Sequence, residues 1–172
     1  MRLLPLFFVL FSLTASAGDS IPDCLNRQGF PLPIDNAQVV QWKHSTPNQY
    51  LAEAHVQGTI DRVYEDHSGH SHFEIRIGDT SDANLEVIYN VEFGSLPSLG
   101  QGMTVEACGD YITSSAPADG YPASPDGAII HWVHGSNNPK KHPSGFLAID
   151  GAVYGQLEGK SKHGIGSFEL EF

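Results

Sequence analysis

Histidines are the residues of this chain whose number and spacing point most directly to chemistry. The sequence holds nine, and six of them fall in or just after two short segments. In chain order these six are His67, His70, His72, His131, His134 and His142. Neutral imidazole is the commonest metal ligand in proteins, and histidine is the side chain that titrates near neutral pH. The spacing therefore favours either a transition-metal site or an acid–base site.

The first interpretation is a zinc or copper site, since imidazole nitrogen suits both metals. The predicted ligands are His72, His131, His134 and His142. Neighbouring polar side chains are expected to orient these rings, or to form an alternative polar site, because ligating histidines usually donate their other ring N–H. They are His67, His70, Glu74, Asn90 and Glu92. The remaining histidines stand alone in the sequence and are expected to be ordinary surface or hydrogen-bonded residues: His44, His55 and His163.

One geometric condition applies to the second segment. His131 and His134 are three residues apart, so in a regular strand they point to opposite faces. Joint ligation requires the strand to end or to bulge near Trp132, which Gly135 permits. Two alternatives stay open: the histidines hydrogen-bond to one another and to the backbone without metal, or they form a metal-free catalytic site.

The elements that must position these side chains are strands. Alternating polarity and β-branched or aromatic content predict five of them: His55–Tyr64, His72–Gly78, Leu85–Asn90, Met103–Ile112 and Ala128–His134. A C-terminal hairpin is expected over Phe146–Ile149 and Ala152–Tyr154, because Asp150-Gly151 suits a two-residue type I′ turn. The stretch Phe93–Gly102 is too rich in Gly, Ser and Pro for a real helix.

Three strands, a connection and two more strands, with Gly58 bending the first, match the plan of an OB-like five-stranded Greek-key barrel. The chain is thus predicted to be all-β, and the alternative is another small β-barrel or sandwich. In the OB topology the second strand runs antiparallel to the third, and the third runs parallel to the fifth. We therefore expect His72, Asn90, Glu92, His134 and the loop bearing His142 to gather at one end of the barrel.

The chain divides into four parts by composition. Residues 1–17 read as a secretory signal peptide, with Arg2, the apolar run Leu3–Leu13 and an Ala-Ser-Ala cleavage site. Residues 18–53 form a proline-rich lead-in with one possible helix at Asn36–Lys43, residues 54–155 the barrel domain, and residues 156–172 a tail or edge strand. We expect an exported protein, periplasmic or secreted, and no later segment has the length to cross a bilayer.

The two cysteines and the acidic net charge bear on the covalent structure and on the class of partner. Export and an even cysteine count predict a disulfide between Cys24 and Cys108, which ties the lead-in to the domain. The formal net charge is −11, or −12 once Arg2 is removed, and this sign disfavours double-stranded nucleic acid as a partner. A small ligand, a metal ion or an extracytoplasmic protein remains as the expected partner.

Several short motifs recur together in a known family. The most specific is an H-W-x-H motif at residues 131–134 within Gly127–His134, followed by His142 and by Gly145-Phe146-Leu147. The others are Val56–Ile60, His72-Phe73, Asn90 and Gly109-Asp110-Tyr111. Together they resemble a family of small exported bacterial proteins classed as a domain of unknown function, over roughly residues 54–154. The family has threonine at the position of Val133 and tryptophan at that of Phe146.

The resemblance implies one domain with one polar site, to which it assigns His72, Asn90, His131, His134 and His142. It implies no activity. Three functions therefore stay open. The first is a binding module with a histidine-lined, zinc or copper site. The second is a metal-dependent hydrolase, such as an exported nuclease or phosphodiesterase, with Glu92 or Glu74 as base. The third is a protein- or glycan-binding module without metal.

Overall fold

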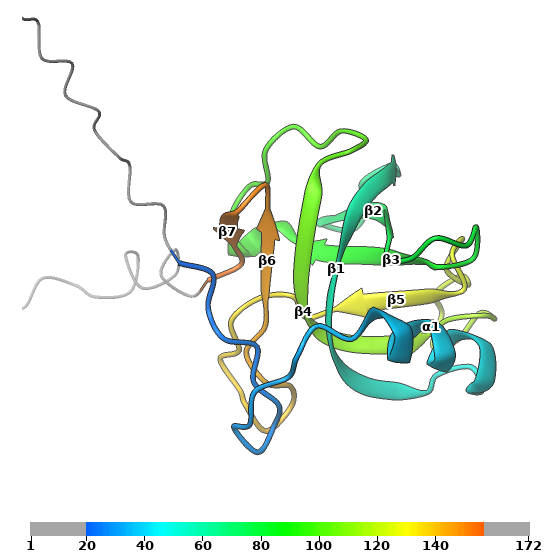
Figure 1. The fold of residues 1–172 in the computed structure, drawn as a ribbon, viewed down its shortest axis with the longest axis horizontal. Coiled ribbons are helices and arrows are strands. Elements are labelled where there is room, and N and C mark those ends of the chain that lie inside the picture. The colour runs from blue at the N-terminus through cyan, green and yellow to red at the C-terminus, as the bar shows by residue number, and fades with distance from the viewer. Residues whose placement is uncertain (1–19, 157–172) are drawn as a thin grey trace, which may run out of the picture.

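The structure is a computed structural model that describes residues 20–156. Within that range one helix precedes seven strands (Figure 1). The elements are α1 (Asn36–Ser45), β1 (Leu51–Val63), β2 (His70–Arg76), β3 (Asn84–Asn90), β4 (Thr104–Thr113), β5 (Ala128–His131), β6 (Phe146–Ile149) and β7 (Ala152–Tyr154), with a short 3₁₀ helix at Val91–Phe93. The expected signal peptide, most of the expected tail and His163 lie outside the described residues.

Five of the strands close into a barrel. The hydrogen-bonded order is β1-β2-β3-β5-β4, and β4 pairs again with β1 to complete the circle. The β3–β5 pair is parallel and the other pairs are antiparallel. This is the strand order predicted for an OB-like Greek-key barrel. β6 and β7 extend the sheet beyond β4 as the predicted C-terminal hairpin.

The long first strand serves both sides of the barrel. Its first part, up to Thr59, pairs with β4, and from Thr59 onward it pairs with β2. The strand can pass this point because Gly58 has no side chain: a Cβ there would lie 2.2 Å from the carbonyl oxygen of Arg76. The register then shifts between Ile60 and Arg62, as in a β-bulge. Bending at Gly58 is thus the local condition for closing the barrel.

The C-terminal turn forms as predicted, whereas two strands begin or end at other residues than predicted. Asp150 and Gly151 have φ of 48° and 82°, the pair of positive values that a type I′ turn requires. β5, in contrast, ends at His131, three residues earlier than predicted, because Trp132 has a φ of 53° and cannot continue a strand. β1 begins at Leu51, four residues earlier than predicted, since its pairing with β4 starts there.

The barrel interior is apolar. Inward-facing side chains from all five barrel strands are at most 1% exposed, and they include Val56, Ile60, Phe73, Ile75, Leu85, Val87, Tyr89, Val105, Ala107, Tyr111 and Ile130. Helix α1 packs on this core through Val39, and the ring of Trp42 lies 5.4 Å from that of Tyr111. The side chain of Asp35 caps the helix by accepting a hydrogen bond from the Gln38 N–H at 2.9 Å.

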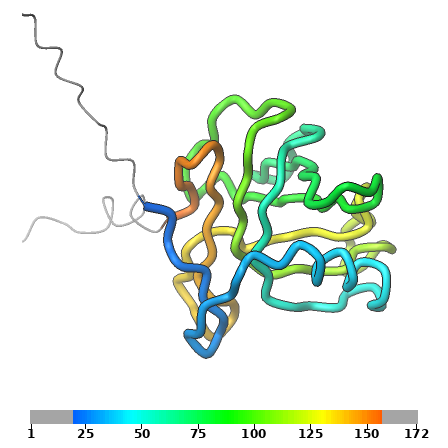
Figure 2. Tube along the Cα trace, viewed as in Figure 1, coloured from blue at the N-terminus to red at the C-terminus, as the bar shows by residue number. Residues whose placement is uncertain are grey.

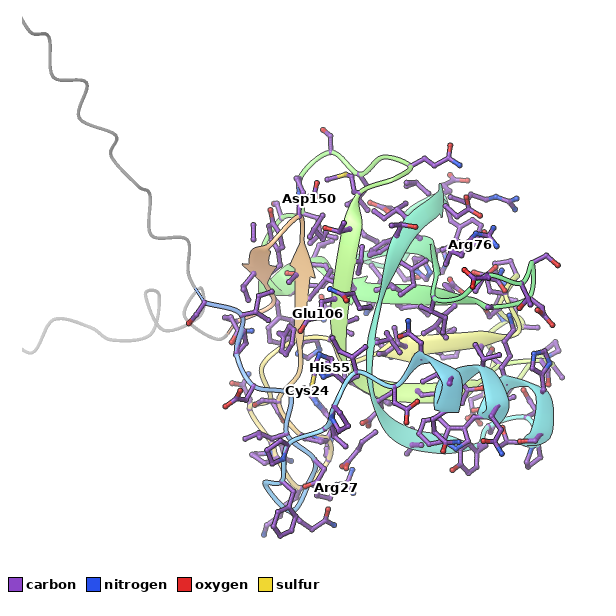
Figure 3. All side chains as sticks on the ribbon, in the orientation of Figure 1. Cys24, Arg27, His55, Arg76, Glu106 and Asp150 are labelled. Carbon is purple, nitrogen blue, oxygen red and sulfur yellow. A yellow bond between two sulfur atoms is a disulfide. The ribbon has the colours of Figure 1, made fainter. Side chains whose placement is uncertain are left out.

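The lead-in is fastened to the barrel wall by the predicted disulfide. Cys24 and Cys108 are bonded, with Cα atoms 5.6 Å apart. His55, close to Cys24 in Figure 3, adds a second tie: its Nδ1 contacts the Leu32 carbonyl at 2.7 Å and its Nε2 contacts Glu106 at 2.9 Å. None of the described helices has the length and apolar character needed to span a membrane.

Replacing both cysteines with alanine is expected to lower the free energy of unfolding by about 2–5 kcal/mol, because the bond closes a long loop in the unfolded chain. Urea denaturation of the oxidised protein and of the double variant measures the difference. A thiol count on denatured, unreduced protein should give no free thiol. Two reactive thiols would contradict the bond.

Candidate functional site

The histidines lie on the outer face of the β2-β3-β5 part of the barrel. Phe73, Ile75 and their neighbours point inward, so the alternate residues of each strand point outward. Outward-facing His72 lies opposite Ile88 of β3 in the strand register. His131, one residue beyond the Val87–Ile130 pair, lies on the same face. Strand pairing therefore brings His72 and His131 to the same face at the same level, on either side of Ile88.

All six of the clustered histidines join one continuous series of ring contacts, which we call the ring row. Successive ring centroids are 3.6 Å apart for Phe93–His134, 5.3 Å for His134–His142, 5.6 Å for His142–Trp132, 4.7 Å for Trp132–His131, 5.6 Å for His131–His70, 6.4 Å for His70–His72 and 3.8 Å for His72–His67. The ring row thus links the two histidine segments along the outer face of the barrel, whereas the OB topology led us to expect one cluster at the barrel end. Trp132 and Phe93, which the sequence did not single out as site residues, complete the row.

The break after β5 is what admits both His131 and His134 to the ring row. Because the strand ends at His131, the two histidines are not forced to opposite faces. Two glycines hold the segment after the break in place. A Cβ on Gly145 would lie 2.6 Å from the Trp132 carbonyl oxygen, and one on Gly155 would lie 2.6 Å from that of Val133. The geometric condition set by the sequence is met by this irregular, tightly packed turn.

Three rings of the row are oriented by backbone carbonyls. The Nδ1 atoms of His70, His134 and His142 lie 2.9, 2.9 and 2.8 Å from the carbonyl oxygens of Ser68, Gly135 and Pro143. A carbonyl only accepts, so each Nδ1 must carry the proton, and the neutral ring then has its lone pair on Nε2. This is the arrangement in which histidines usually ligate metals.

His72 is oriented by a carboxylate, deeper in the same face. Its Nδ1 lies 2.7 Å from Glu86 Oε1, and the hydroxyl of Ser124 donates to Glu86 Oε2 at 2.6 Å. Both His72 and Glu86 are 5% exposed. Within the described residues the buried Nε2 of His72 has no hydrogen-bond partner. A buried polar atom without a partner is costly, and functional sites are one place where that cost is tolerated.

His131, at the centre of the row, is held in its neutral form. Burial, and then the neighbouring imidazoles of His70, His134, His142 and His72, lower its pKa to about 4. A neutral imidazole keeps the lone pair that a metal needs, so His131 is ready to act as a ligand at neutral pH.

The histidines come together in pairs. Two imidazoles on one tetrahedral metal, with metal–nitrogen bonds of about 2.0–2.1 Å, have ring centroids about 5 Å apart. The edge-to-face pairs His70–His131 and His134–His142, at 5.6 and 5.3 Å, are near this spacing. Among residues 20–156, however, no three or more histidine, cysteine, aspartate or glutamate side chains are placed to hold one ion. The indole of Trp132 contacts a ring of each pair.

The remaining predicted residues lie around this face. Asn90, opposite His70 in the register, caps the 3₁₀ helix by accepting from the Glu92 N–H at 2.9 Å. Glu92 is exposed at that corner. Glu74 is buried directly opposite Glu86 and accepts from Asn84 Nδ2 at 3.0 Å.

Two acidic residues of the site were not predicted from the sequence: Glu86, which orients His72, and Asp126. Asp126 comes from the loop before β5, is 7% exposed, and accepts hydrogen bonds at 3.0 Å from Tyr64 and Asn84. Burial, together with the charges of Glu74 and Glu86, raises the pKa of Asp126 to about 6. Nothing in the loop sequence around Asp126 distinguishes it from a solvated turn residue.

Comparison of the chain with models of known protein families and with curated proteins gives no match.

Replacing Asp126 with asparagine tests the buried acid network. The raised pKa means that the folded state favours protonated Asp126, so its contribution to stability falls as the pH rises from about 4 to about 6 and is constant above that. The asparagine has no proton to lose and still offers an oxygen to Tyr64 and Asn84. Its stability relative to the wild type should therefore increase across this interval, as measured by urea denaturation at several pH values.

The exposed residue Asp79 offers a matched control, since Asp79→Asn removes a surface carboxylate. Parallel pH profiles for wild type and Asp126→Asn would show that Asp126 is not held protonated by the fold.

Proposed function

We propose that this protein is an exported binding module that holds zinc or copper at the ring row. The proposal rests chiefly on the unpartnered, buried Nε2 of His72, whose ring is fixed from the other side by Glu86. Metal coordination gives that nitrogen the partner that the described residues do not provide. The carboxylate on Nδ1 also makes the imidazole a stronger ligand.

The ligands would come from His72, His131, His134 and His142, with His70 joining them. His70 links the two central histidines, since its ring lies 6.4 Å from that of His72 and 5.6 Å from that of His131. His70 follows the tight turn at Ser68-Gly69, where both residues have positive φ and where the chain is exposed. We propose that this exposed turn moves when a metal binds, so that His70 joins His72 and His131, because no three of the described side chains share an ion in the present conformation.

The surroundings agree with a metal carrier outside the cytoplasm. The disulfide is compatible with an oxidising compartment. A site built of imidazoles, with no thiolate, suits zinc and copper(II) and does not oxidise there. Buffering or delivery of one of these metals is therefore the role we favour.

A second candidate is a hydrolase, and one observation favours it. The His72–Glu86 pair is the arrangement of a general base oriented by a carboxylate. The bases suggested by the sequence fit less well: Glu74 already accepts a hydrogen bond from Asn84, and Glu92 is exposed at the edge of the face. Turnover of a phosphodiester substrate that stops on adding a chelator would favour the metal-dependent hydrolase over the carrier.

Micromolar zinc or copper(II) should raise the melting temperature of the wild-type protein. A ligand that binds only the folded state stabilises it by about 2.7 kcal/mol at a hundredfold excess over Kd. His70→Ala and His131→Ala should each remove most of the shift. The shift should also fade below about pH 6, because the imidazoles must lose their protons to bind. Differential scanning calorimetry and competition with a chromophoric chelator give the two measurements.

His44→Ala is the matched control. This histidine is on the surface, contacts Asp82 at 3.2 Å and lies outside the ring row. If it weakens binding as much as His131→Ala does, or if the wild-type melt ignores both metals, then the ring row does not hold a metal.

A further inference from the structure

A second polar cavity lies on the barrel wall beside the ring row. It is an open hollow of about 290 Å³ between the N-terminal lead-in and the outer faces of β1 and β4. Its lining residues are Arg27, Gln28, Leu51, Ala52, Glu53 and Asp110. Figure 2 shows the lead-in running beside the 135–145 loop at this side of the molecule, where Arg27 Nη2 donates to the Lys141 carbonyl at 3.3 Å. Arg27 is labelled in Figure 3.

The two carboxylates of the cavity are in very different situations. Both oxygens of Glu53 accept from the backbone N–H of Arg27 at 3.1 Å, and the Arg27 Nε lies 3.5 Å from Glu53 Oε1. Asp110, opposite Glu53 in the register, is 3% exposed. No hydrogen bond or ion pair from residues 20–156 is found for the Asp110 carboxylate, although its oxygens are not among the fully buried side-chain atoms without a partner. Asp110 is thus a largely buried acid that lines the open hollow.

This situation is unfavourable for an ionised carboxylate. A buried charge is normally paired, and removal of the partner is what makes it costly. The Arg27 guanidinium is held by Glu53 and by the Lys141 carbonyl, so it does not fill that role.

We propose that the cavity binds a small organic cation, a primary ammonium on a short alkyl chain, with Asp110 as its counter-ion. An ammonium group brings three donors and one positive charge, which match a single unpaired carboxylate. Leu51 and Ala52 line the wall beside it and would contact the alkyl chain. A cavity of about 290 Å³ has room for such a molecule, since one water occupies about 30 Å³ in the liquid.

Two other ligand classes fit this cavity less well. A divalent metal takes several oxygen ligands, and Glu53 is already engaged by Arg27. An anion would face two carboxylates. The proposal does not depend on metal at the ring row, because none of the six cavity residues belongs to that row.

The test is an NMR titration of the oxidised protein with n-butylammonium chloride, in the presence of a chelator. We expect saturable shifts of the amide signals of Ala52, Glu53 and Asp110 at concentrations up to tens of millimolar. 1-Butanol, which has the same chain without the charge, should give no saturable shift there. Asp110→Asn should weaken binding at least about tenfold, and Asp82→Asn, which removes an exposed carboxylate, should leave it unchanged.

Arg27→Gln separates the proposal from its nearest rival, in which Arg27 turns to pair with Asp110 in solution. If the amine binds the wild type and Arg27→Gln binds it at least as tightly, the open-cavity assignment holds. If only Arg27→Gln binds the amine, Arg27 is the resident partner and the proposal is wrong. Equal shifts with 1-butanol, or wild-type affinity in Asp110→Asn, would overturn it as well.

Discussion

Closure of the barrel by β1 is the constraint on which the rest of this structure depends. One strand must pair with β4 and then turn to pair with β2, and it can do so because the backbone of Arg76 approaches Gly58 where any side chain would collide. Once the circle is closed, the register of every strand is set relative to the others. The outward-facing residues then form a band around the barrel, and they follow in the order His72, Ile88, His131, Asp110 and Glu53.

The band explains why polar groups of this protein are buried on the outside of the barrel. Covering loops, and not the core, exclude water from His72, Glu74 and Glu86, each of which is 5% exposed. The buried carboxylates accept hydrogen bonds mainly from neutral donors; the Ser124 hydroxyl, for example, donates to Glu86. Burial and the charges of Glu74 and Glu86 raise the pKa of Asp126 to about 6, and Lys43 only partly opposes this.

The sequence predicted the parts of this arrangement that follow from periodicity and topology. Alternation identified the strands, and the OB order then placed the two histidine segments on β2 and β5, the strands on either side of β3, without any knowledge of contacts. What it missed depends on backbone conformation and on long-range burial. The positive φ of Trp132 ends β5 early, although the residue has no glycine-like signal of its own. The roles of Asp126 and Asp110 arise from what covers them, which local sequence does not encode.

The centre of the band also separates the two sites chemically. Asp110 and His131 are cross-strand partners, and an imidazolium there would be the natural counter-ion for the carboxylate. The pKa of His131 is lowered to about 4 by burial and by four surrounding imidazoles, so the ring is uncharged at neutral pH. Because the crowded histidines keep His131 uncharged, its cross-strand neighbour Asp110 has no imidazolium beside it. In the two proposals, the same uncharged His131 is both a metal ligand of the ring row and the reason that Asp110 has no cation beside it.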